Sequence, residues 1–227
     1  FRSVEEAEAA FLQLLLTLAT AEAALSLEHR DLHVGNVLIR RLGTAASNEE
    51  KDNEMDDDGE ETTATLPYRL YGRAFRLRSQ GLRLSVIDFT NSRMSKKGMT
   101  IYTDLAGDEE LFAGPADEYQ FDVYRMMRQH NGNDWKSFCP KTNVMWLHYV
   151  VEKLLTTKRY PKKKPTKRQA ARLRAVYDEL LSYSSCLAAI TRDGAVLSLL
   201  EEYLLFDPSA AGDRSDEDDE SAGTQEE

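Results

Sequence analysis

The stretch that decides the fold is His29-Arg30-Asp31-Leu32-His33-Val34-Gly35-Asn36, or H-R-D-L-H-V-G-N. Before it, the run from Ser3 to Leu25 is rich in alanine, leucine and glutamate, with apolar residues at helical spacing. Ser3 followed by Glu6 is typical of a helix capping box. After it comes the apolar run Val37-Leu38-Ile39. We therefore predict a long buried helix, a polar loop and a short strand.

The loop matches the protein-kinase catalytic-loop pattern H-R-D-L-x-x-x-N at every specified position. Phosphoryl transfer depends on positioning: a carboxylate accepts the proton of the attacking hydroxyl, and an amide oxygen five residues later holds a metal ion. The resemblance gives these roles to Asp31 and Asn36, with His29 and Arg30 completing the catalytic motif. The alternative for Asp31 is an ordinary turn cap.

A kinase needs a second metal ligand after a strand, normally the aspartate of D-F-G. Here Val86-Ile87-Asp88-Phe89-Thr90 supplies Asp88 after an apolar run. Thr90 stands where that motif has glycine. Because glycine is the flexible residue of the motif, we expect a more fixed arrangement and hypothesise a constitutively active enzyme.

Two other classes fit these motifs. Choline kinases and aminoglycoside phosphotransferases have similar H-x-D-x-H-x-x-N loops, and His33 stands where most protein kinases have lysine. A pseudokinase that acts as a scaffold is the second alternative, although Asp31, Asn36 and Asp88 are all retained.

More of the chain resembles the haspin family of protein kinases, up to about Phe206. The resemblance is carried, in chain order, by L-E-H-R-D-L-H-V-G-N-V-L-I, V-I-D-F-T-N-S-R, D-E-E-L-F, E-Y-Q-F-D-V-Y-R and N-V-M-W-L-H-Y. It implies a serine/threonine kinase that uses ATP and Mg²⁺ to phosphorylate a threonine of the histone 3 N-terminal tail. The family acts in mitosis, which implies a location in the nucleus and on chromosomes.

The resemblance also implies roles for single residues. His33 matches the family's own histidine and would contact the nucleotide. Asn36 and Asp88 would bind both the nucleotide and the metal ion.

Substrate and structural roles are implied as well. Asp108 and Glu110 fall where the family places acids that bind the basic histone tail, and Asp122 matches a buried carboxylate that braces the catalytic-loop backbone. The alternatives are a solvated helix start for the first two, since carboxylates favour the first turn, and an ordinary buried cap for Asp122.

The rest of the chain predicts a mostly helical α+β lobe. Strand-like runs are Tyr68–Phe75 and Leu82–Phe89, joined by a turn at Ser79–Gly81. The predicted helices are Tyr119–Gln129, Val144–Thr156, Lys167–Tyr183 and Val196–Phe206.

Nothing ahead of the catalytic loop reads as a glycine-rich loop or as the nucleotide-binding lysine of protein kinases. We therefore expect residues 1–207 to form the C-terminal lobe of a kinase without its N-terminal lobe. Such a fragment would transfer phosphate negligibly by itself.

Charge is unevenly distributed. Glu49–Glu61 carries a net charge of −8 and Asp213–Glu227 of −7, so the remainder is mildly basic although the whole chain has −10. Such runs predict a disordered insert at 47–62 and a disordered tail at 208–227. Lys158–Arg174 holds nine basic residues. It is a solvated loop and helix face, a contact with nucleic acid or the nucleosome, or a nuclear localisation signal.

Only two cysteines are present, without metal-ligand spacing. The longest apolar stretch, Phe11–Leu25, is interrupted by polar residues and falls short of a membrane span. We expect it to be a core helix and expect no membrane contact.

Overall fold

The computed structural model describes residues 1–42 and 64–206. The predicted acidic insert (47–62) and acidic tail (208–227) lie outside these residues. The described helices are α1 (Val4–Leu25), α2 (Glu109–Phe112), α3 (Tyr119–Asn131), α4 (Lys141–Thr156), α5 (Lys167–Leu180), α6 (Cys186–Thr191) and α7 (Ala195–Tyr203), with one 3₁₀ turn at Val34–Asn36. The strands are β1 (Val37–Arg41), β2 (Thr65–Leu70), β3 (Arg73–Arg78), β4 (Leu82–Val86), β5 (Arg93–Lys96), β6 (Met99–Tyr102) and β7 (Leu204–Phe206).

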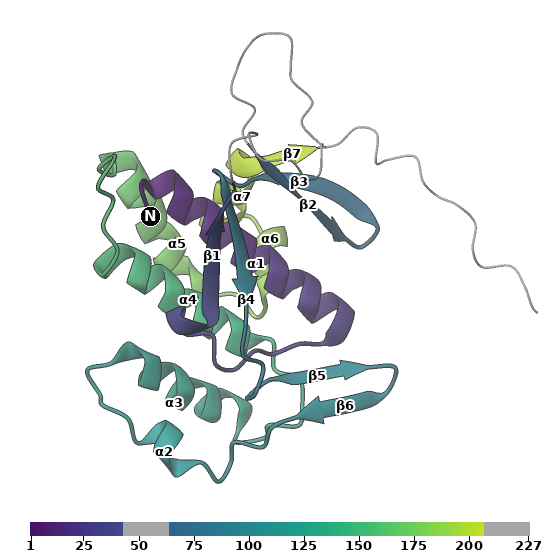
Figure 1. Cartoon of the computed structure of the whole chain (residues 1–227). Helices are drawn as coiled ribbons and strands as arrows, with labels where there is room; N and C mark the ends of the chain where they lie inside the picture. The colour runs from purple at the N-terminus through teal and green to yellow at the C-terminus, as the bar shows by residue number, and fades with distance from the viewer. Residues whose placement is uncertain (43–63, 207–227) are drawn as a thin grey trace, which may run out of the picture.

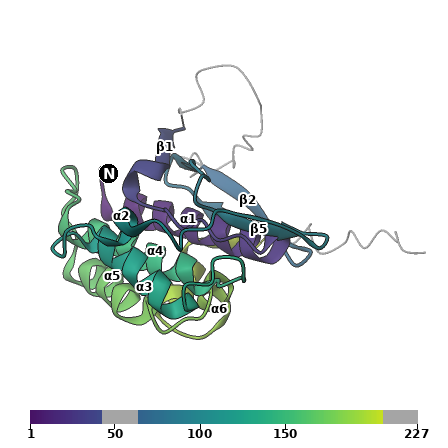
Figure 2. The same ribbon diagram turned by 90° about the horizontal axis from the view of Figure 1, so that it is seen from below.

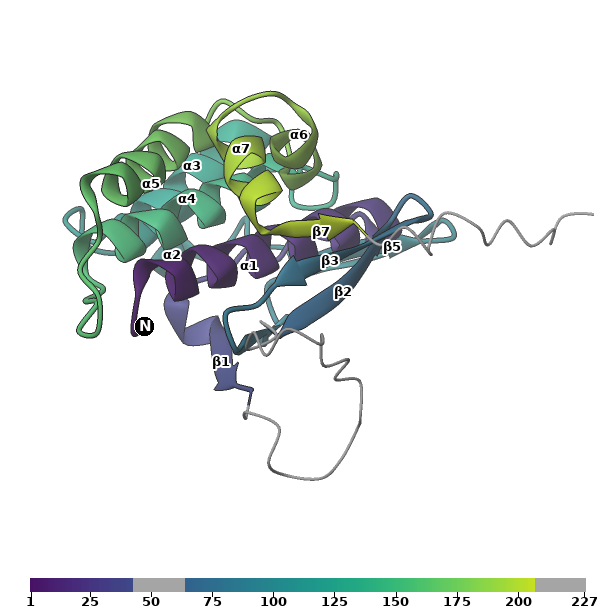
Figure 3. The same ribbon diagram turned by 90° about the horizontal axis from the view of Figure 1, so that it is seen from above.

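Helix α1 is the centre of the molecule. Figure 3 shows it between the strands β1, β2 and β3 and a layer of helices that includes α4, α5 and α7, and Figure 2 shows β1 and β2 on one side of it and α4 and α5 on the other. Because α1 is covered on both faces, residues around its whole circumference are buried, including Phe11, Leu12 and Leu15. A helix that is apolar all round is one that lies in a core. The prediction of a long buried helix is confirmed.

Helix α1 is long and apolar enough to cross a membrane, but 67% of its most apolar stretch is buried inside the protein, as in the core helix of a folded domain. Ser3 caps the helix by accepting a hydrogen bond from the Glu6 amide. The other half of the predicted capping box is wrong. Glu6 accepts from the Arg2 amide at 2.7 Å and pairs with Arg41 at the end of β1.

The strands form three small antiparallel sheets (Figure 1). Strands β1 and β4 pair from Val37↔Val86 to Arg41↔Leu82, which brings the residues after the catalytic loop beside those before Asp88. Gln13 of α1 fixes this pair from below, because its side-chain amide donates to Leu82 O and accepts from Leu84 N.

The prediction of one strand over Tyr68–Phe75 is wrong, because β2 and β3 are the two arms of a hairpin that turns at Tyr71-Gly72. Both turn residues have positive φ, +49° and +73°, as a two-residue hairpin turn requires. The predicted strand Leu82–Phe89 ends at Val86.

The prediction also missed three strands: β5 and β6, which follow Asp88, and β7, which follows α7. The hairpin of β5 and β6 was not foreseen, and Leu204–Phe206 is strand β7 paired with β3, not the end of a helix. Short strands with few alternating apolar residues give a weak signal in sequence. By contrast, the predicted helices correspond closely to α3, α4 and α5.

Helices α3, α4 and α5 meet at a buried polar contact. His148 of α4 lies with its Nδ1 2.5 Å from the Tyr119 hydroxyl of α3, and its ring stacks on Tyr177 of α5 at 4.0 Å between centroids. Burial lowers the pKa of His148 from 6.5 to about 4, against the opposing charges of Glu152 and Asp178. The folded protein therefore keeps this imidazole neutral at mildly acidic pH.

This gives a prediction for stability against pH. The unfolded chain protonates His148 near pH 6.5 and the folded chain only near pH 4. Between these values the unfolded chain binds more protons, so the free energy of unfolding is highest above pH 6.5 and decreases as the pH falls towards 4. The free energy of unfolding, measured in urea from pH 7 to pH 5, should fall more steeply for the wild type than for His148→Gln. Parallel slopes would contradict the prediction.

Candidate active site

Asn36 connects the catalytic loop with the end of β4. Its side-chain Nδ2 donates to Asp31 O at 2.8 Å, and its backbone oxygen accepts from Ile87 N at 3.0 Å. His33 tightens the turn between them, because its Nδ1 accepts from Gly35 N at 3.0 Å. The structure thus brings four of the predicted site residues together: Asp31, His33 and Asn36 in the loop, and Asp88 through the adjoining Ile87.

Both carboxylate oxygens of Asp31 are engaged. Oδ1 accepts a hydrogen bond from the Tyr124 hydroxyl and lies 3.7 Å from His33 Nε2, and Oδ2 accepts from Asn91 Nδ2 at 3.4 Å. Partial burial raises the pKa of Asp31, and the hydrogen bond from Tyr124 opposes that increase. A carboxyl held in this way has the raised basicity that suits a general base.

Asp88 is exposed and has φ +60°, in the left-handed region that few residues other than glycine adopt. Thr90 stabilises this turn, since its amide and its hydroxyl both donate to Asp88 Oδ1, at 3.2 and 2.7 Å. These two hydrogen bonds lower the pKa of Asp88. Thr103 Oγ1 in turn donates to Thr90 O at 2.5 Å. The lowered pKa favours the charged form of Asp88. Its turn is held by Thr90, which is itself bound by Thr103 of the segment after β6.

His29 is buried and does not reach the surface of the site. Its Nε2 donates to Ile87 O at 3.1 Å, its Nδ1 accepts from Asp31 N at 3.4 Å, and its ring lies 5.0 Å from that of Phe89. Burial lowers its pKa, so the ring stays neutral. The prediction of His29 as a catalytic residue is corrected, because its ring is fully buried and its contacts hold Asp31 and the Asp88 segment in place.

Arg30 is corrected in the same way. Its side chain is fully buried, with φ +66°, and its Nε and Nη2 donate to the two oxygens of Glu28 at 3.2 and 3.1 Å. The guanidinium lies over the Trp135 ring at 5.3 Å, and Nη1 donates to Thr103 O at 3.4 Å. Arg30 is therefore a structural cation beneath the catalytic loop.

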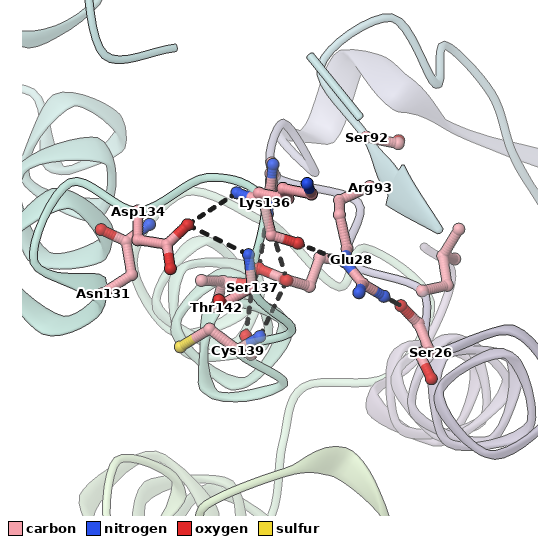
Figure 4. A network of polar contacts seen from close by, with 12 residues as sticks. Ser26, Glu28, Ser92, Arg93, Asn131, Asp134, Lys136, Ser137, Cys139 and Thr142 are labelled. Carbon is pink, nitrogen blue, oxygen red and sulfur yellow. Dashed lines mark hydrogen bonds and ion pairs between the residues drawn. The ribbon is translucent and has the colours of Figure 1, made fainter. Parts of the chain in front are cut away.

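Glu28 is the centre of the polar network in Figure 4. Besides Arg30, its carboxylate accepts from Cys139 N at 2.8 Å and from Thr142 Oγ1 at 2.9 Å. Its backbone forms a two-way bridge with Arg93, the first residue of β5. Arg93 itself donates to Ser26 O and Lys136 O. The segment between α3 and α4 is thus bound to Glu28, just before the catalytic loop, through Cys139, and to the start of β5 through Lys136.

The same segment has its own turn. Asp134 accepts from the amides of Lys136 and Ser137 at 2.9 and 3.1 Å, as Figure 4 shows. Those hydrogen bonds lower the pKa of Asp134.

Asp122 does not brace the catalytic loop, so this expectation is wrong. Its side chain is 44% exposed and pairs with Arg125 one turn later in α3. Asn143 of α4 takes that place: its Oδ1 accepts from His29 N at 3.0 Å and its Nδ2 donates to Leu27 O at 2.8 Å. Ser92 adds a hydrogen bond to His29 O. An uncharged amide does the bracing.

The acidic pair predicted for substrate lies on the surface. Asp108 is the N-cap of α2 and accepts from Leu111 N at 3.1 Å, and Glu110 is exposed. Their loop is held by Arg125, which donates to Phe112 O at 3.1 Å and to Gly114 O at 3.0 Å. Asp108 therefore has a structural role as a cap, and Glu110 is open to solvent.

The basic segment Lys158–Arg174 spans an irregular loop and the first half of α5. Part of its charge is neutralised by ion pairs within the chain: Lys163 pairs with Glu5, Arg172 with Glu8 and Glu202, and Arg174 with Asp178. Lys162, Lys164 and Lys167 are exposed.

Sequence reasoning missed Tyr124, Asn91, Asn143 and Glu28. Each contacts the catalytic loop, and apart from Glu28 each comes from a distant part of the chain. Glu28 and Asn91 directly adjoin the two motifs, which is the one signal that sequence offers for them. Nothing local distinguishes Tyr124 or Asn143 from other residues of an amphipathic helix.

Comparison with known proteins supplies the family. Residues 1–185 match the family model "Haspin like kinase domain". The chain is 35% identical to the serine/threonine-protein kinase haspin of Bos taurus over 186 residues, which are 81% of this chain and 21% of that protein. The values for the mouse protein of the same name are 35% over 204 residues, 90% and 24%. For the Drosophila melanogaster homolog they are 38% over 160 residues, 70% and 25%.

The arrangement of helices and short strands is compatible with a protein-kinase domain, the family model describes a kinase domain, and the matched relatives are serine/threonine-protein kinases by name. Within this class, the chain belongs to the haspin-like kinase domain family. It spans about a fifth to a quarter of the length of these curated relatives.

The buried Glu28–Arg30 pair gives a prediction. Glu28→Gln leaves the Arg30 cation without a counter-charge where neither side chain is exposed, and it should lower the free energy of unfolding by about 3–5 kcal/mol. The matched control is Asp178→Asn, which breaks the exposed Arg174–Asp178 pair and should cost about 0–1 kcal/mol. Urea unfolding measures the free energy of unfolding of both variants. Equal decreases would show that the buried pair contributes no more to stability than the exposed one.

Proposed function

We propose that this chain carries the catalytic base and metal ligands of a serine/threonine protein kinase of haspin type. The enzyme would transfer the γ-phosphoryl group of ATP to a threonine of the histone 3 N-terminal tail in mitosis. The observation that supports this best is the gathering of Asp31, Asn36 and Asp88, with the Asp31 carboxylate held on both oxygens. We further propose that the chain forms the C-terminal lobe of that kinase.

The donor set suits a nucleotide with Mg²⁺. Asn36 and Asp88 offer an amide oxygen and a carboxylate of lowered pKa, which are ligands that Mg²⁺ prefers. No group of three or more metal-ligating side chains occurs in residues 1–42 and 64–206. Mg²⁺ in such enzymes takes only one or two protein carboxylates and completes its shell with phosphates and water. The bound ion would neutralise charge on the phosphates.

Asp31 would accept the proton of the attacking hydroxyl. Its raised pKa makes it a better base than an exposed aspartate. His33 would contact the nucleotide, because its Nε2 lies on the same side of the loop as Asp31 Oδ1, 3.7 Å away.

Asp108 and Glu110 would recognise the basic tail. Three successive acids, Asp108-Glu109-Glu110, lie on an exposed surface. Glu109 lies 3.5 Å from Arg128, whereas no ion pair within the described residues involves Asp108 or Glu110. Carboxylates on such a surface raise the local concentration of a cationic peptide.

A small-molecule phosphotransferase is the alternative that His33 favours, and this open acidic surface argues against it. A scaffold without catalysis is the other alternative, against which the held Asp31 argues. The nuclear and chromosomal location stays a prediction from the family. So does a nucleosome contact through Lys158–Arg174, for which the exposed Lys162, Lys164 and Lys167 are the candidates.

The base assignment is tested by Asp31→Asn in the full-length protein. With ATP and a histone 3 tail peptide, kcat should fall by about 10²–10⁴-fold because the proton acceptor is lost. Asp178→Asn, on the far helix α5, should keep the wild-type rate. Comparable rates for Asp31→Asn and the wild type would refute the role of base. Phosphorylation of choline or an aminoglycoside in place of the peptide would support the alternative.

The substrate surface is tested by the double variant Asp108→Asn, Glu110→Gln. Asparagine keeps the helix cap, so the change removes charge without unwinding α2. The KM for the histone peptide should rise at least about tenfold, and the KM for ATP should stay constant. The control, Asp193→Asn, removes an exposed carboxylate elsewhere. An unchanged peptide KM would contradict the assignment.

A further inference from the structure

Tyr124 is a buried residue of α3 whose hydroxyl reaches the catalytic loop from 93 residues away in sequence. It is 2% exposed, and its ring meets Trp146 edge-on at 5.1 Å and Phe121 at 6.3 Å. Packing on both sides leaves the ring little freedom to turn. The direction of its hydroxyl is therefore fixed by the core.

Tyr124 is the donor in its contact with Asp31. Burial raises the pKa of the phenol far above its ordinary value of 10, with the adjacent carboxylate as a second cause. The phenol stays protonated, and Asp31 Oδ1 accepts its hydrogen. Among the described residues, the opposite oxygen, Oδ2, accepts one hydrogen bond, the long 3.4 Å contact from Asn91.

From this geometry we infer that Tyr124 is a positioning residue for Asp31, which orients the carboxylate so that Oδ2 faces the incoming hydroxyl. The inference rests on the proposed function, in which Asp31 is the base. A carboxylate with one oxygen fixed by a strong donor presents its other oxygen in one direction. Orientation of this kind is where phosphoryl-transfer enzymes gain most of their rate.

Tyr124 has a neighbour that extends its effect. Arg125, the next residue of α3, donates to Phe112 O and Gly114 O of the loop that follows the acidic surface. One turn of α3 thus holds the base with one residue and the proposed peptide-binding loop with the next. This fixes the position of the peptide surface relative to Asp31.

The test is Tyr124→Phe in the full-length protein, which removes one oxygen and keeps the ring that packs on Trp146. Tyr119→Phe is the matched control, since it removes a hydroxyl from the same helix that contacts His148. With ATP and the histone 3 tail peptide, Tyr124→Phe should lower kcat about tenfold. Its KM values for ATP and for the peptide should stay close to those of the wild type, because the hydroxyl orients the base and binds neither substrate. Tyr119→Phe should keep the wild-type kcat.

A second readout does not depend on turnover. In crystal structures of the variants, the Asp31 carboxylate should leave its present orientation in Tyr124→Phe and keep it in Tyr119→Phe. The same orientation in both variants and in the wild type overturns the inference. If the carboxylate turns but neither the wild type nor any variant transfers phosphate, the contact stands and the proposed function fails. If the wild type is active and Tyr124→Phe matches Tyr119→Phe in kcat, the positioning role is wrong.

Discussion

The buried ion pair between Glu28 and Arg30 is the constraint on which the rest of the structure depends. Both side chains are fully buried, so each charge has lost its water and must be compensated inside the protein. Glu28 is satisfied by Arg30, the Cys139 amide and the Thr142 hydroxyl, and Arg30 by Glu28, Thr103 O and the Trp135 ring. Each of these partners is a fixed point for the loop.

The consequence is that the catalytic loop and the segment around Asp88 are held in unfavourable backbone conformations. Arg30 and Asp88 both have positive φ, a backbone conformation that costs free energy in residues with a side chain. The buried pair beneath Arg30 and the Thr90 hydrogen bonds at Asp88 offset that cost. Between them, His29 joins the two strained segments through Ile87 O and Phe89. Thr90, in the place of the usual glycine, adds to this rigidity.

Several errors of prediction have one physical cause. Asp122 carries the charge expected of a brace, yet it faces solvent beside Arg125, and Asn143 on another helix holds the loop instead. Asp122 and Asn143 both lie in helices, and the pattern of apolar residues does not say which polar residue faces the loop. Likewise His29 and Arg30 belong to the catalytic motif, but both side chains are fully buried, so they support the loop from within the protein.

The sequence alone determined the catalytic motif, the second carboxylate at Asp88, the core helix α1 and the helices α3 to α5. It could do so because these features are local: a motif fixes residue types at fixed spacing, and a helix repeats its apolar residues every few positions. Only the tertiary structure decided which groups hold Asp31. Tyr124, Asn91 and Asn143 reach the loop from 60 to 114 residues away. Contacts over that distance depend on how helices pack, and short-range patterns carry no record of it.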